Sequence, residues 1–419
     1  MIIVVNLPPE KDRRVIREAQ ALEAAGGRVT VIGPRSADQP THLPGTRDAR
    51  IRSFRQPFAG TGILSFVAEF GWAFVAVSAR LLGVLVRTRV DGVQACNPPD
   101  VFWPVALVMR ATRRPFVFDH HDLSPELYEC KTDRPNPVAL RVLRLFERLS
   151  WRCASAIVAT NESYRQMALE RGKVRPGKVT IVRNGPTLAE VGAAPPDPVP
   201  APRRAEPGED DRQIIAYVGV INPQDCVEVA VLTAERLAEL RGRDGWQLVV
   251  AGDGESLPAL RNLVAERRLH DIVRFTGWLA PHEVHALLRS AVVAIQPDLR
   301  SAMSELSTMA KTVEYVAYGV PVVSVDLREA RATAGEAALY VRTGTPDEFA
   351  KALDQLLGDP SARAMMHTVA RDRFATRLAW DHQAESYIRL WGGLLGYRTT
   401  RYNSLRSSVR VGEVAESQR

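Results

Sequence analysis

One short stretch of the chain, Ser301 to Val325, contains acidic, basic and hydroxyl side chains at spacings that could bind a phosphate-bearing ligand. The periodicity of residues 307–318 predicts a helix within it. A helix N-terminus that follows a strand holds an anion through its free N–H groups and its dipole. Ser307 and Thr308 would add hydroxyl donors at that start, and Lys311 lies one turn further in. The stretch therefore predicts an anion site.

Glu314 lies three residues after Lys311, deeper in the predicted helix. Its carboxylate could accept hydrogen bonds from a diol such as a ribose. The alternative is a capped surface helix in which Lys311 and Glu314 form an intrahelical ion pair. Spacing alone supports the two interpretations about equally.

The elements that would position these residues follow an alternating pattern from the first residue onward. Short β-branched runs alternate with helical periodicity, beginning with a strand at 2–5, a helix at 12–25 and a strand at 29–32. Such alternation predicts a parallel sheet covered on both faces. Further strands of the first half are expected at 92–95, 115–118, 156–159 and 179–182.

The alternation stops at a Pro-rich and charged segment and then starts again. Residues 189–212 read as a linker between a first domain at 1–188 and a second at 213–377. A helix at 378–396 is expected to pack back on the first domain, and the polar tail at 397–419 is expected to be disordered. Strands of the second domain are expected at 214–218, 247–250, 273–275, 292–295, 322–325 and 339–341.

Composition and charge exclude several classes of protein. The 419 residues are 46% hydrophobic and 25% charged, which is typical of a globular chain. The net charge of +7 suits phosphate-bearing ligands or an anionic membrane. The sequence lacks the dense basic run interleaved with aromatic residues that would indicate nucleic-acid binding. The cysteines have no metal-ligand spacing and read as reduced thiols: Cys96, Cys130, Cys153 and Cys226.

The N-terminal residues 1–6 read as a strand without a secretory signal, so a cytoplasmic protein is expected. The apolar segment at 62–86 is interrupted by Glu69 and Arg80, and it falls short of the roughly 20 uninterrupted apolar residues of a spanning helix. It reads either as a buried or half-buried helix or as a peripheral contact with the inner face of the cytoplasmic membrane.

The run Glu314 to Val323, EYVAYGVPVV, resembles the E-x-x-A-x-G-x-P-V-V signature of GT-B glycosyltransferases of family 4. Further landmarks in the same order resemble this family across about residues 1 to 395. They include DHHDLSPELY at 119–128, VRNGP at 182–186, VAGDGES at 250–256 and FTGWL at 275–279. The ordered series is far more specific than any single motif.

The resemblance implies a GT-B fold, with two Rossmann-like, doubly wound parallel-sheet domains facing across a cleft. It implies that the C-terminal domain binds a nucleotide-diphosphate sugar and the N-terminal domain a glycan or polyprenyl-linked acceptor, in the assembly of cell-surface polysaccharide. It also implies transfer with retention of configuration and no metal or other cofactor. Helix dipoles, N–H groups and cations must then offset the charge on the leaving diphosphate.

Carried over by position, the resemblance assigns three candidate residues. Glu314 matches the acidic residue expected to hold the ribose. The first acidic residue of the signature would fall on Leu306, and this chain has Glu305 one position earlier, which makes Glu305 the candidate for the catalytic carboxylate. His121 matches a histidine expected near the reacting sugar, although its neighbour His120 competes for that role.

The chain departs from the family pattern in the loop after its first predicted strand of the second domain. Many relatives carry an arginine directly after Gly219 and a lysine five positions later, and here these positions hold Val220 and Asp225. Loss of two cations from a diphosphate site is costly unless other groups replace them. We expect Lys311 to be the main replacement, with Arg300 and Arg13 or Arg14 as weaker candidates.

The remaining donor-site candidates have two interpretations each. Gly252, Asp253 and Gly254 form either a strand-end turn or a wall of the nucleotide-base pocket. Glu329 matches an acidic residue near the donor, although it could equally belong to a salt-bridged loop.

Two other functions stay open from the sequence. One is a nucleotide-sugar epimerase or hydrolase on the same scaffold. The other is a non-catalytic binding protein, suggested by Val220 and Asp225.

Overall fold

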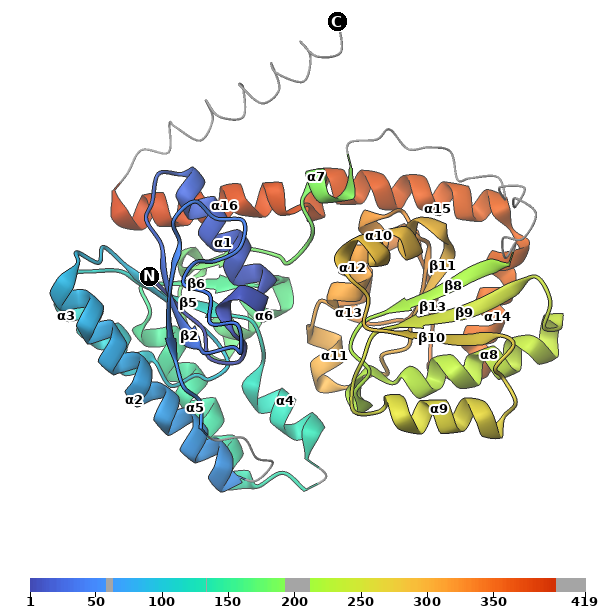
Figure 1. Ribbon diagram of the computed structural model, residues 1–419, viewed down its shortest axis with the longest axis horizontal. Helices are drawn as coiled ribbons and strands as arrows, with labels where there is room; N and C mark the ends of the chain where they lie inside the picture. Colours follow the sequence, from blue (N-terminus) through green and yellow to red (C-terminus); the bar gives the residue numbers. More distant parts are fainter. Residues whose placement is uncertain (58–62, 133, 193–211, 397–419) are drawn as a thin grey trace, which may run out of the picture. The chain divides into compact units, whose positions relative to one another are not determined.

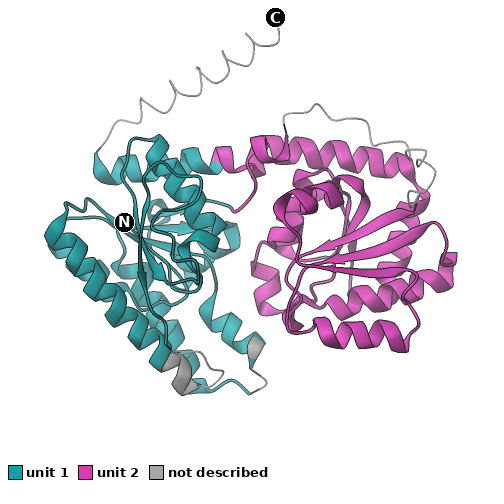
Figure 2. Cartoon of the chain, in the orientation of Figure 1, with its two compact units in different colours: residues 1–183, 383–419 teal, residues 184–382 magenta. Residues whose placement is uncertain are grey.

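The computed structural model describes residues 1–57, 63–132, 134–192 and 212–396. The chain forms two compact units, shown in Figure 2: unit 1 comprises Met1–Arg183 and the chain from Gln383, and unit 2 comprises Asn184–His382. Most of the predicted linker at 189–212 and the whole predicted tail at 397–419 lie outside the described residues. Each unit is described by itself.

Unit 1 is built on a sheet of seven strands in the order β3-β2-β1-β4-β5-β6-β7, and every pair in it is parallel. Strand β1, where the strand order reverses, pairs through Ile2 with Val31 of β2 on one side and with Gln94 of β4 on the other. Strands β2, β5 and β6 of this sheet are labelled in Figure 1. The strands are β1 (Ile2–Ile3), β2 (Thr30–Pro34), β3 (Arg50–Phe54), β4 (Val93–Cys96), β5 (Phe116–His120), β6 (Ala156–Ala159) and β7 (Val179–Ile181).

The helices of unit 1 connect these strands. Helix α1 begins where the Asp12 carboxylate accepts hydrogen bonds from the backbone N–H groups of Arg14 and Val15, at 3.0 and 3.1 Å. This satisfies donors that have no partner within the helix. The helices are η1 (Pro9–Lys11), α1 (Arg13–Ala24), α2 (Ile63–Arg87), α3 (Trp103–Ala111), α4 (Ser124–Lys131), α5 (Pro137–Cys153), α6 (Glu162–Glu170) and η2 (Pro176–Lys178).

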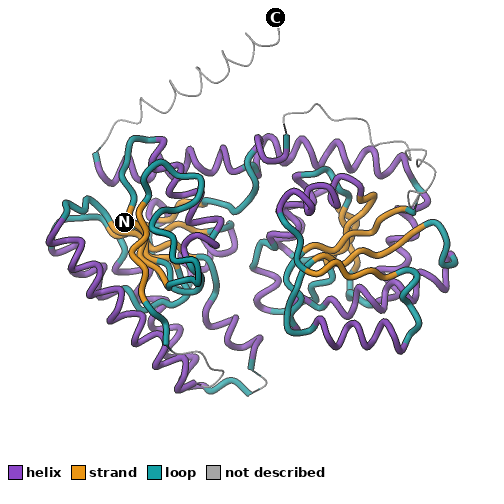
Figure 3. The backbone as a smooth tube through the Cα atoms, viewed as in Figure 1, coloured by secondary structure: helices purple, strands orange, loops and turns teal. Residues whose placement is uncertain are grey.

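Unit 2 is built on a six-stranded parallel sheet in the order β10-β9-β8-β11-β12-β13. In each sheet the strand order reverses beside the first strand, which makes both units doubly wound. Figure 3 shows the strands of each unit flanked by helices. The strands are β8 (Gln213–Val218), β9 (Trp246–Ala251), β10 (Val273–Gly277), β11 (Ala291–Gln296), β12 (Val322–Val325) and β13 (Ala338–Val341).

The helices of unit 2 pack on both faces of its sheet. Two buried clusters hold them there, one of them around Trp246 and Phe349 and the other around Tyr315 and Phe374. The helices are α7 (Leu188–Val191), η3 (Pro223–Asp225), α8 (Val227–Arg241), α9 (Leu257–Glu266), α10 (Pro281–Ser290), α11 (Ala302–Leu306), α12 (Ala310–Ala317), α13 (Arg328–Ala334), η4 (Gly335–Ala337), α14 (Pro346–Gly358), α15 (Pro360–Arg373) and η5 (Phe374–Leu378).

The last helix, α16 (Trp380–Leu395), carries the chain back into unit 1. The buried Tyr387 hydroxyl donates to the Gln94 side chain of β4 at 2.6 Å. Gly92 lies directly under Trp391, because a Cβ at this position would be 2.6 Å from the indole ring. A side chain at position 92 would therefore push α16 away from the sheet.

The structure confirms the parallel doubly wound sheets that the sequence predicts, with two differences. β3 was not expected, because its sequence, RIRSF, alternates with polar residues instead of forming an apolar run. The helix predicted from Ser307 begins instead at Ala310, and a separate short helix, α11, precedes it. The predicted helix start was therefore wrong by three residues.

Candidate functional site

In open α/β sheets, ligands bind at the carboxyl ends of the strands where the strand order reverses. In unit 2 this point lies between β8 and β11. Gly219 follows β8 there, and the Lys311 side chain lies beneath it, since a Cβ on Gly219 would be 3.5 Å from the lysine Cε. The structure thus places two of the predicted donor-site residues together.

The Lys311 ammonium is engaged by two carboxylates. Its Nζ lies 3.0 and 3.1 Å from the two carboxylate oxygens of Asp298, which follows β11, and 3.2 Å from Asp225 Oδ1. It also lies 5.1 Å from the centre of the Tyr217 ring. Although burial opposes a charge on Lys311, the two carboxylates raise its pKa. The lysine is therefore a buried, charged group that two acids already neutralise.

Asp298 was not among the residues singled out from the sequence. Burial raises its pKa, and the Lys311 ammonium opposes that shift. The only sequence signal for it was its place directly after a buried apolar strand. Asp225, interpreted from the sequence as the loss of a cation, is in the structure a partner of the lysine on α12.

Ser307 and Thr308 lie between α11 and α12, before the helix and not in its first turn. Met309 is the N-cap of α12 and contributes no side-chain hydrogen bond. The Thr308 hydroxyl donates to Glu329 Oε2 at 3.0 Å, and the Glu329 side chain is buried on α13. This contact joins two predicted donor-site residues across the loop.

Glu305 lies on α11, and its carboxylate binds other parts of unit 2. Oε2 accepts the backbone N–H of Arg328 at 3.0 Å, at the start of α13, and Oε1 forms an ion pair with Arg300. Glu314 is partly buried on α12, where Lys311 contacts the two aspartates that lie outside the helix. The roles assigned to Glu305 and Glu314 from the sequence stay predictions.

The glycines of the two loops after β8 and β9 pack against each other through their backbones. A Cβ on Gly252 would lie 1.8 Å from the Gly219 carbonyl oxygen, and one on Gly254 would lie 2.3 Å from the Ile221 carbonyl oxygen. Between them, the Asp253 carbonyl accepts the Ile221 N–H at 3.0 Å. Close packing thus requires glycine at 252 and 254, whatever a ligand would add.

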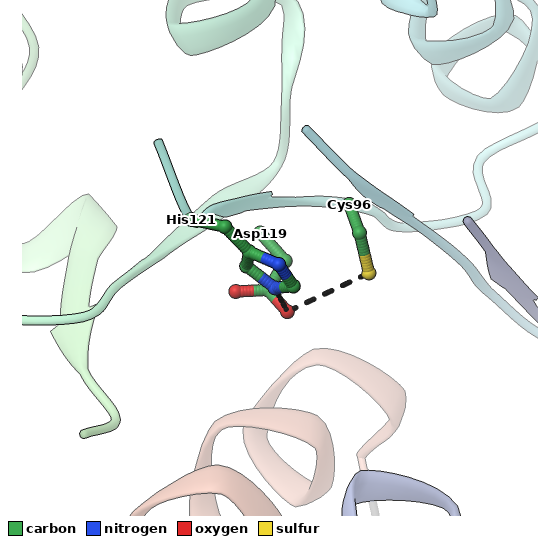
Figure 4. A group of neighbouring side chains, drawn as sticks. All are labelled: Cys96, Asp119 and His121. Atoms are coloured by element: carbon green, nitrogen blue, oxygen red, sulfur yellow. Dashed lines mark hydrogen bonds and ion pairs between the residues drawn. The ribbon is translucent and has the colours of Figure 1, made fainter. Parts of the chain in front are cut away.

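In unit 1 the carboxyl ends of β4 and β5 bring together Cys96, Asp119 and His121 (Figure 4). His121 Nε2 lies 2.7 Å from Asp119 Oδ2. The backbone N–H of His121 donates to Asn97 Oδ1 at 2.5 Å. The His121 side chain keeps 12% of its surface exposed, while Asp119 is completely buried. The histidine is thus held in one orientation at the carboxyl end of β5.

Arg14 neutralises the carboxylate that holds His121. Its guanidinium donates to both Asp119 oxygens, at 2.8 and 3.1 Å, and to the carbonyl of Val182 at 2.9 Å. Burial would raise the pKa of Asp119, but Arg14 and His121 together lower it. Arg14 is therefore committed within unit 1, and the expectation that it could serve as a diphosphate cation was wrong.

The ligand atoms of Cys96, Asp119 and His121 lie within 4.8 Å of one another, which is close enough to surround a metal ion. The Arg14 guanidinium, however, occupies both oxygens of the same carboxylate and would repel a cation there. Burial also raises the pKa of the Cys96 thiol well above its usual value, which disfavours the thiolate that a metal needs. These residues therefore fit an ion-pair network better than a metal centre.

The structure separates the roles of the two neighbouring histidines. His120 is completely buried, with the rings of Phe118, Trp151 and Tyr164 centred 5.0 to 5.6 Å from its own. Burial lowers its pKa to about 3. His120 is thus a neutral core residue, and His121 is the member of the pair that a ligand can reach.

Two family models match the chain, and together they cover most of it. One, described as a glycosyl transferase 4-like domain, matches residues 12–185, and the other, described as glycosyl transferases group 1, matches residues 212–359. Alpha-D-kanosaminyltransferase of Streptomyces kanamyceticus is 33% identical over 39% of this chain and 42% of its own length. D-inositol 3-phosphate glycosyltransferase of Kineococcus radiotolerans is 30% identical over 62% of this chain and 61% of its own length. The chain thus spans about half the length of these curated relatives.

Solved structures resemble the whole described chain. Sucrose-phosphate synthase of Thermosynechococcus elongatus superposes with a TM-score of 0.70 at 17% identity, covering 94% of this chain and 99% of that one. Anabaena HepE in complex with UDP-glucose gives a TM-score of 0.66 at 15% identity, covering 94% and 99%. These similarities confirm the GT-B fold expected from the sequence.

Proposed function

This chain belongs to the glycosyltransferases of group 1, and we propose that it transfers a sugar from a nucleotide-diphosphate sugar to a glycan or polyprenyl-linked acceptor. The observation that carries the proposal is the position of Lys311 beneath Gly219, at the reversal point of a doubly wound sheet. Ligands of such sheets bind at this point. The complexes of HepE with UDP and UDP-glucose support a nucleotide sugar as the donor.

In this proposal, the diphosphate takes the place of Asp225 beside Lys311. Asp225 keeps 16% of its side chain exposed, whereas Asp298 is buried and retains its contact with the ammonium. Lys311 and the loop N–H groups then offset the charge of the leaving diphosphate. Glu314 holds the ribose, Glu329 contacts the donor sugar, and the turn at 252–254 borders the base.

We assign His121 to the reacting sugar, where its imidazole donates a hydrogen bond or stabilises charge. Asp119 fixes its orientation. The resemblance of the 119–128 stretch to the family supports this role. In this proposal the transfer retains the configuration of the sugar. It needs no metal, because Lys311 and the N–H groups of the protein stabilise the leaving group.

We place the reaction at the cytoplasmic side of the membrane, in the assembly of cell-surface polysaccharide. The apolar segment at 62–86 supports a reaction close to a membrane surface.

The test is an assay of the purified chain with a panel of nucleotide sugars and with soluble and lipid-linked acceptors. Release of nucleoside diphosphate that requires both donor and acceptor is the expected result, and it persists in EDTA. NMR of the product gives the anomeric configuration. No release above background with any pair would contradict the proposal.

A non-catalytic binding protein is the second candidate, favoured by the two carboxylates that neutralise Lys311. It predicts that nucleoside diphosphates raise the melting temperature while no donor turns over. Turnover of a donor without an acceptor would instead indicate a hydrolase or an epimerase.

A further inference from the structure

Helix α2 presents an uninterrupted apolar stripe to solvent. Trp72, Val75, Ala79, Leu82 and Val86 are all exposed, and their spacing of three and four residues places them on one side of the helix. The four large side chains keep between 41% and 78% of their surface accessible. A soluble helix normally carries polar residues on this side.

The opposite side of α2 is fixed to unit 1. Ala73, Ala76, Val77 and Leu81 are buried, and the Arg80 guanidinium donates to the Ser53 carbonyl of β3 at 2.8 Å. Among the described residues, Ala68–Arg87 is the one segment long and apolar enough to cross a membrane, with 22% of it buried. Because its inner side is committed to the protein, α2 suits a position along a membrane surface and not across it.

Two neighbouring helices extend this surface. The ring of Phe74 on α2 stacks on that of Phe102, which precedes α3, with 6.1 Å between the ring centres. The rings of Trp103 on α3 and Phe146 on α5 are centred 6.4 Å apart. In a parallel sheet with right-handed crossovers, helices whose connections step across the sheet in the same direction cover the same face. The exposed large apolar residues of the three helices are Trp72, Val75, Leu82, Val86, Leu107, Val108, Val138, Val142 and Leu145. We call them the apolar face.

Arginines accompany the apolar face on its three helices, and one of them, Arg144, pairs with Glu129 of α4. Among the described side chains of α2, α3 and α5 the two acidic residues are Glu69, which is partly buried and accepts from Gln56, and Glu147, which is buried beside Arg171. The exposed arginines of these helices are Arg87, Arg110, Arg141, Arg144, Arg148 and Arg152. The surface is therefore both apolar and positively charged, and Figure 1 labels the three helices that carry it.

We propose that the apolar face and its arginines dock unit 1 on an anionic lipid bilayer. The apolar side chains enter the interface between headgroups and acyl chains, and the arginines pair with lipid phosphates. A second copy of the chain fits this surface poorly, because a two-fold contact would set arginines against arginines, and the described side chains of α2, α3 and α5 include no exposed acid to oppose them. This inference goes beyond sugar transfer and requires no donor to be bound.

The test is flotation of the full chain with vesicles of phosphatidylcholine alone and of phosphatidylcholine with phosphatidylglycerol. We expect binding to the anionic vesicles that weakens as salt rises. The triple variant R87Q/R110Q/R141Q lowers the partition coefficient on the order of 100-fold, since each arginine near such a surface contributes roughly fivefold. The matched control R261Q/R274Q/R342Q removes three exposed arginines of unit 2 and leaves binding unchanged.

The apolar contribution is tested with V75E/L82E, which we expect to reduce binding at least about tenfold. The control L240E/M365E changes two similarly exposed residues of unit 2 and keeps wild-type binding. Unchanged thermal unfolding shows that each variant is folded. Three results would overturn the proposal: no binding to anionic vesicles, equal loss in the controls, or a dimer in light scattering that V75E/L82E dissociates.

Discussion

Lys311 of α12 and Asp225 of η3 form an ion pair, with Nζ 3.2 Å from Oδ1. Many proteins of the family that the sequence resembles carry a lysine at the position of Asp225. Here an acid occupies that position, and a lysine from another helix faces it. The cation beside the Gly219 loop thus comes from α12, and the acid at 225 competes with any anion for it.

Neutralising Asp225 is expected to strengthen nucleotide binding. In Asp225→Asn, the ammonium keeps Asp298 as a partner and loses the more exposed of its two carboxylates, so UDP meets one negative charge fewer. We expect the UDP dissociation constant to fall about tenfold, measured by calorimetry. Asp347→Asn, an exposed acid at the start of α14, is the control and leaves affinity unchanged. Weaker binding of UDP to D225N would show that Lys311 does not bind the diphosphate.

Replacing His121 is expected to slow the chemical step without loosening the fold. The side chain reaches solvent, and Arg14 still pairs with both oxygens of Asp119 in His121→Asn, so the buried carboxylate is not left unpaired. Loss of a group that stabilises charge in the transition state costs on the order of 100-fold in kcat. The donor KM and the melting temperature stay close to wild type. His42→Asn, an exposed histidine of the same unit, retains full activity; an equal loss there would refute a specific role for His121.

His120 makes the protein sensitive to acid. Its pKa is about 3 in the folded state against about 6.5 when unfolded, so the unfolded chain binds the proton first. The stability that neutral His120 provides is complete above pH 6.5 and declines as the pH falls towards 3. At pH 5 the loss amounts to about 2 kcal/mol.

His120→Phe removes this titration while keeping an aromatic ring among Phe118, Trp151 and Tyr164. We therefore expect the stability difference between pH 7.5 and pH 5, from urea unfolding, to be about 2 kcal/mol smaller in the variant. Glu147 and Arg171 lie beside this site and remain in both proteins, so their titration cancels in the comparison. An identical difference in wild type and variant would show that His120 does not titrate in this range.

Two substitutions of Glu305 distinguish anchoring from catalysis. Because its carboxylate accepts the Arg328 N–H at the start of α13, an anchoring role is expected to survive in Glu305→Gln, which keeps an acceptor oxygen. We expect E305Q to retain transfer within about threefold, whereas E305A loses about 1 kcal/mol of stability. If both variants lose transfer while their stability is unchanged, Glu305 acts as the catalytic carboxylate assigned from the sequence.

Much of the fold could be predicted because the strands are buried on both sides. Such strands are apolar runs, and all four residues of β6 and of β12 are buried as expected. The edge strand β3 lacked this signal, because two of its residues are exposed arginines. The start of α12 was misplaced because Thr308 bonds to Glu329 of α13, a tertiary contact that local periodicity does not reveal.

The candidate site was only partly predictable. The types of residue near Lys311 were found from their positions at strand ends, but their pairing was not. Lys311 is 86 residues from Asp225 in the chain, and no spacing rule links a helix to a loop at that distance. Likewise, Arg14 and Asp119 are 105 residues apart, and only the folded sheet shows that their charges cancel.

The route of the chain sets the order in which the protein can be completed during synthesis. Gln94 and Gly92 emerge early from the ribosome, yet their partners Tyr387 and Trp391 are translated only after all of unit 2. Unit 2 is therefore the first unit whose whole sequence is available to fold, although it comes second in the gene. A nascent chain halted anywhere before α16 leaves the surface over Gly92 open, so the packing of unit 1 is completed only after α16 has been translated.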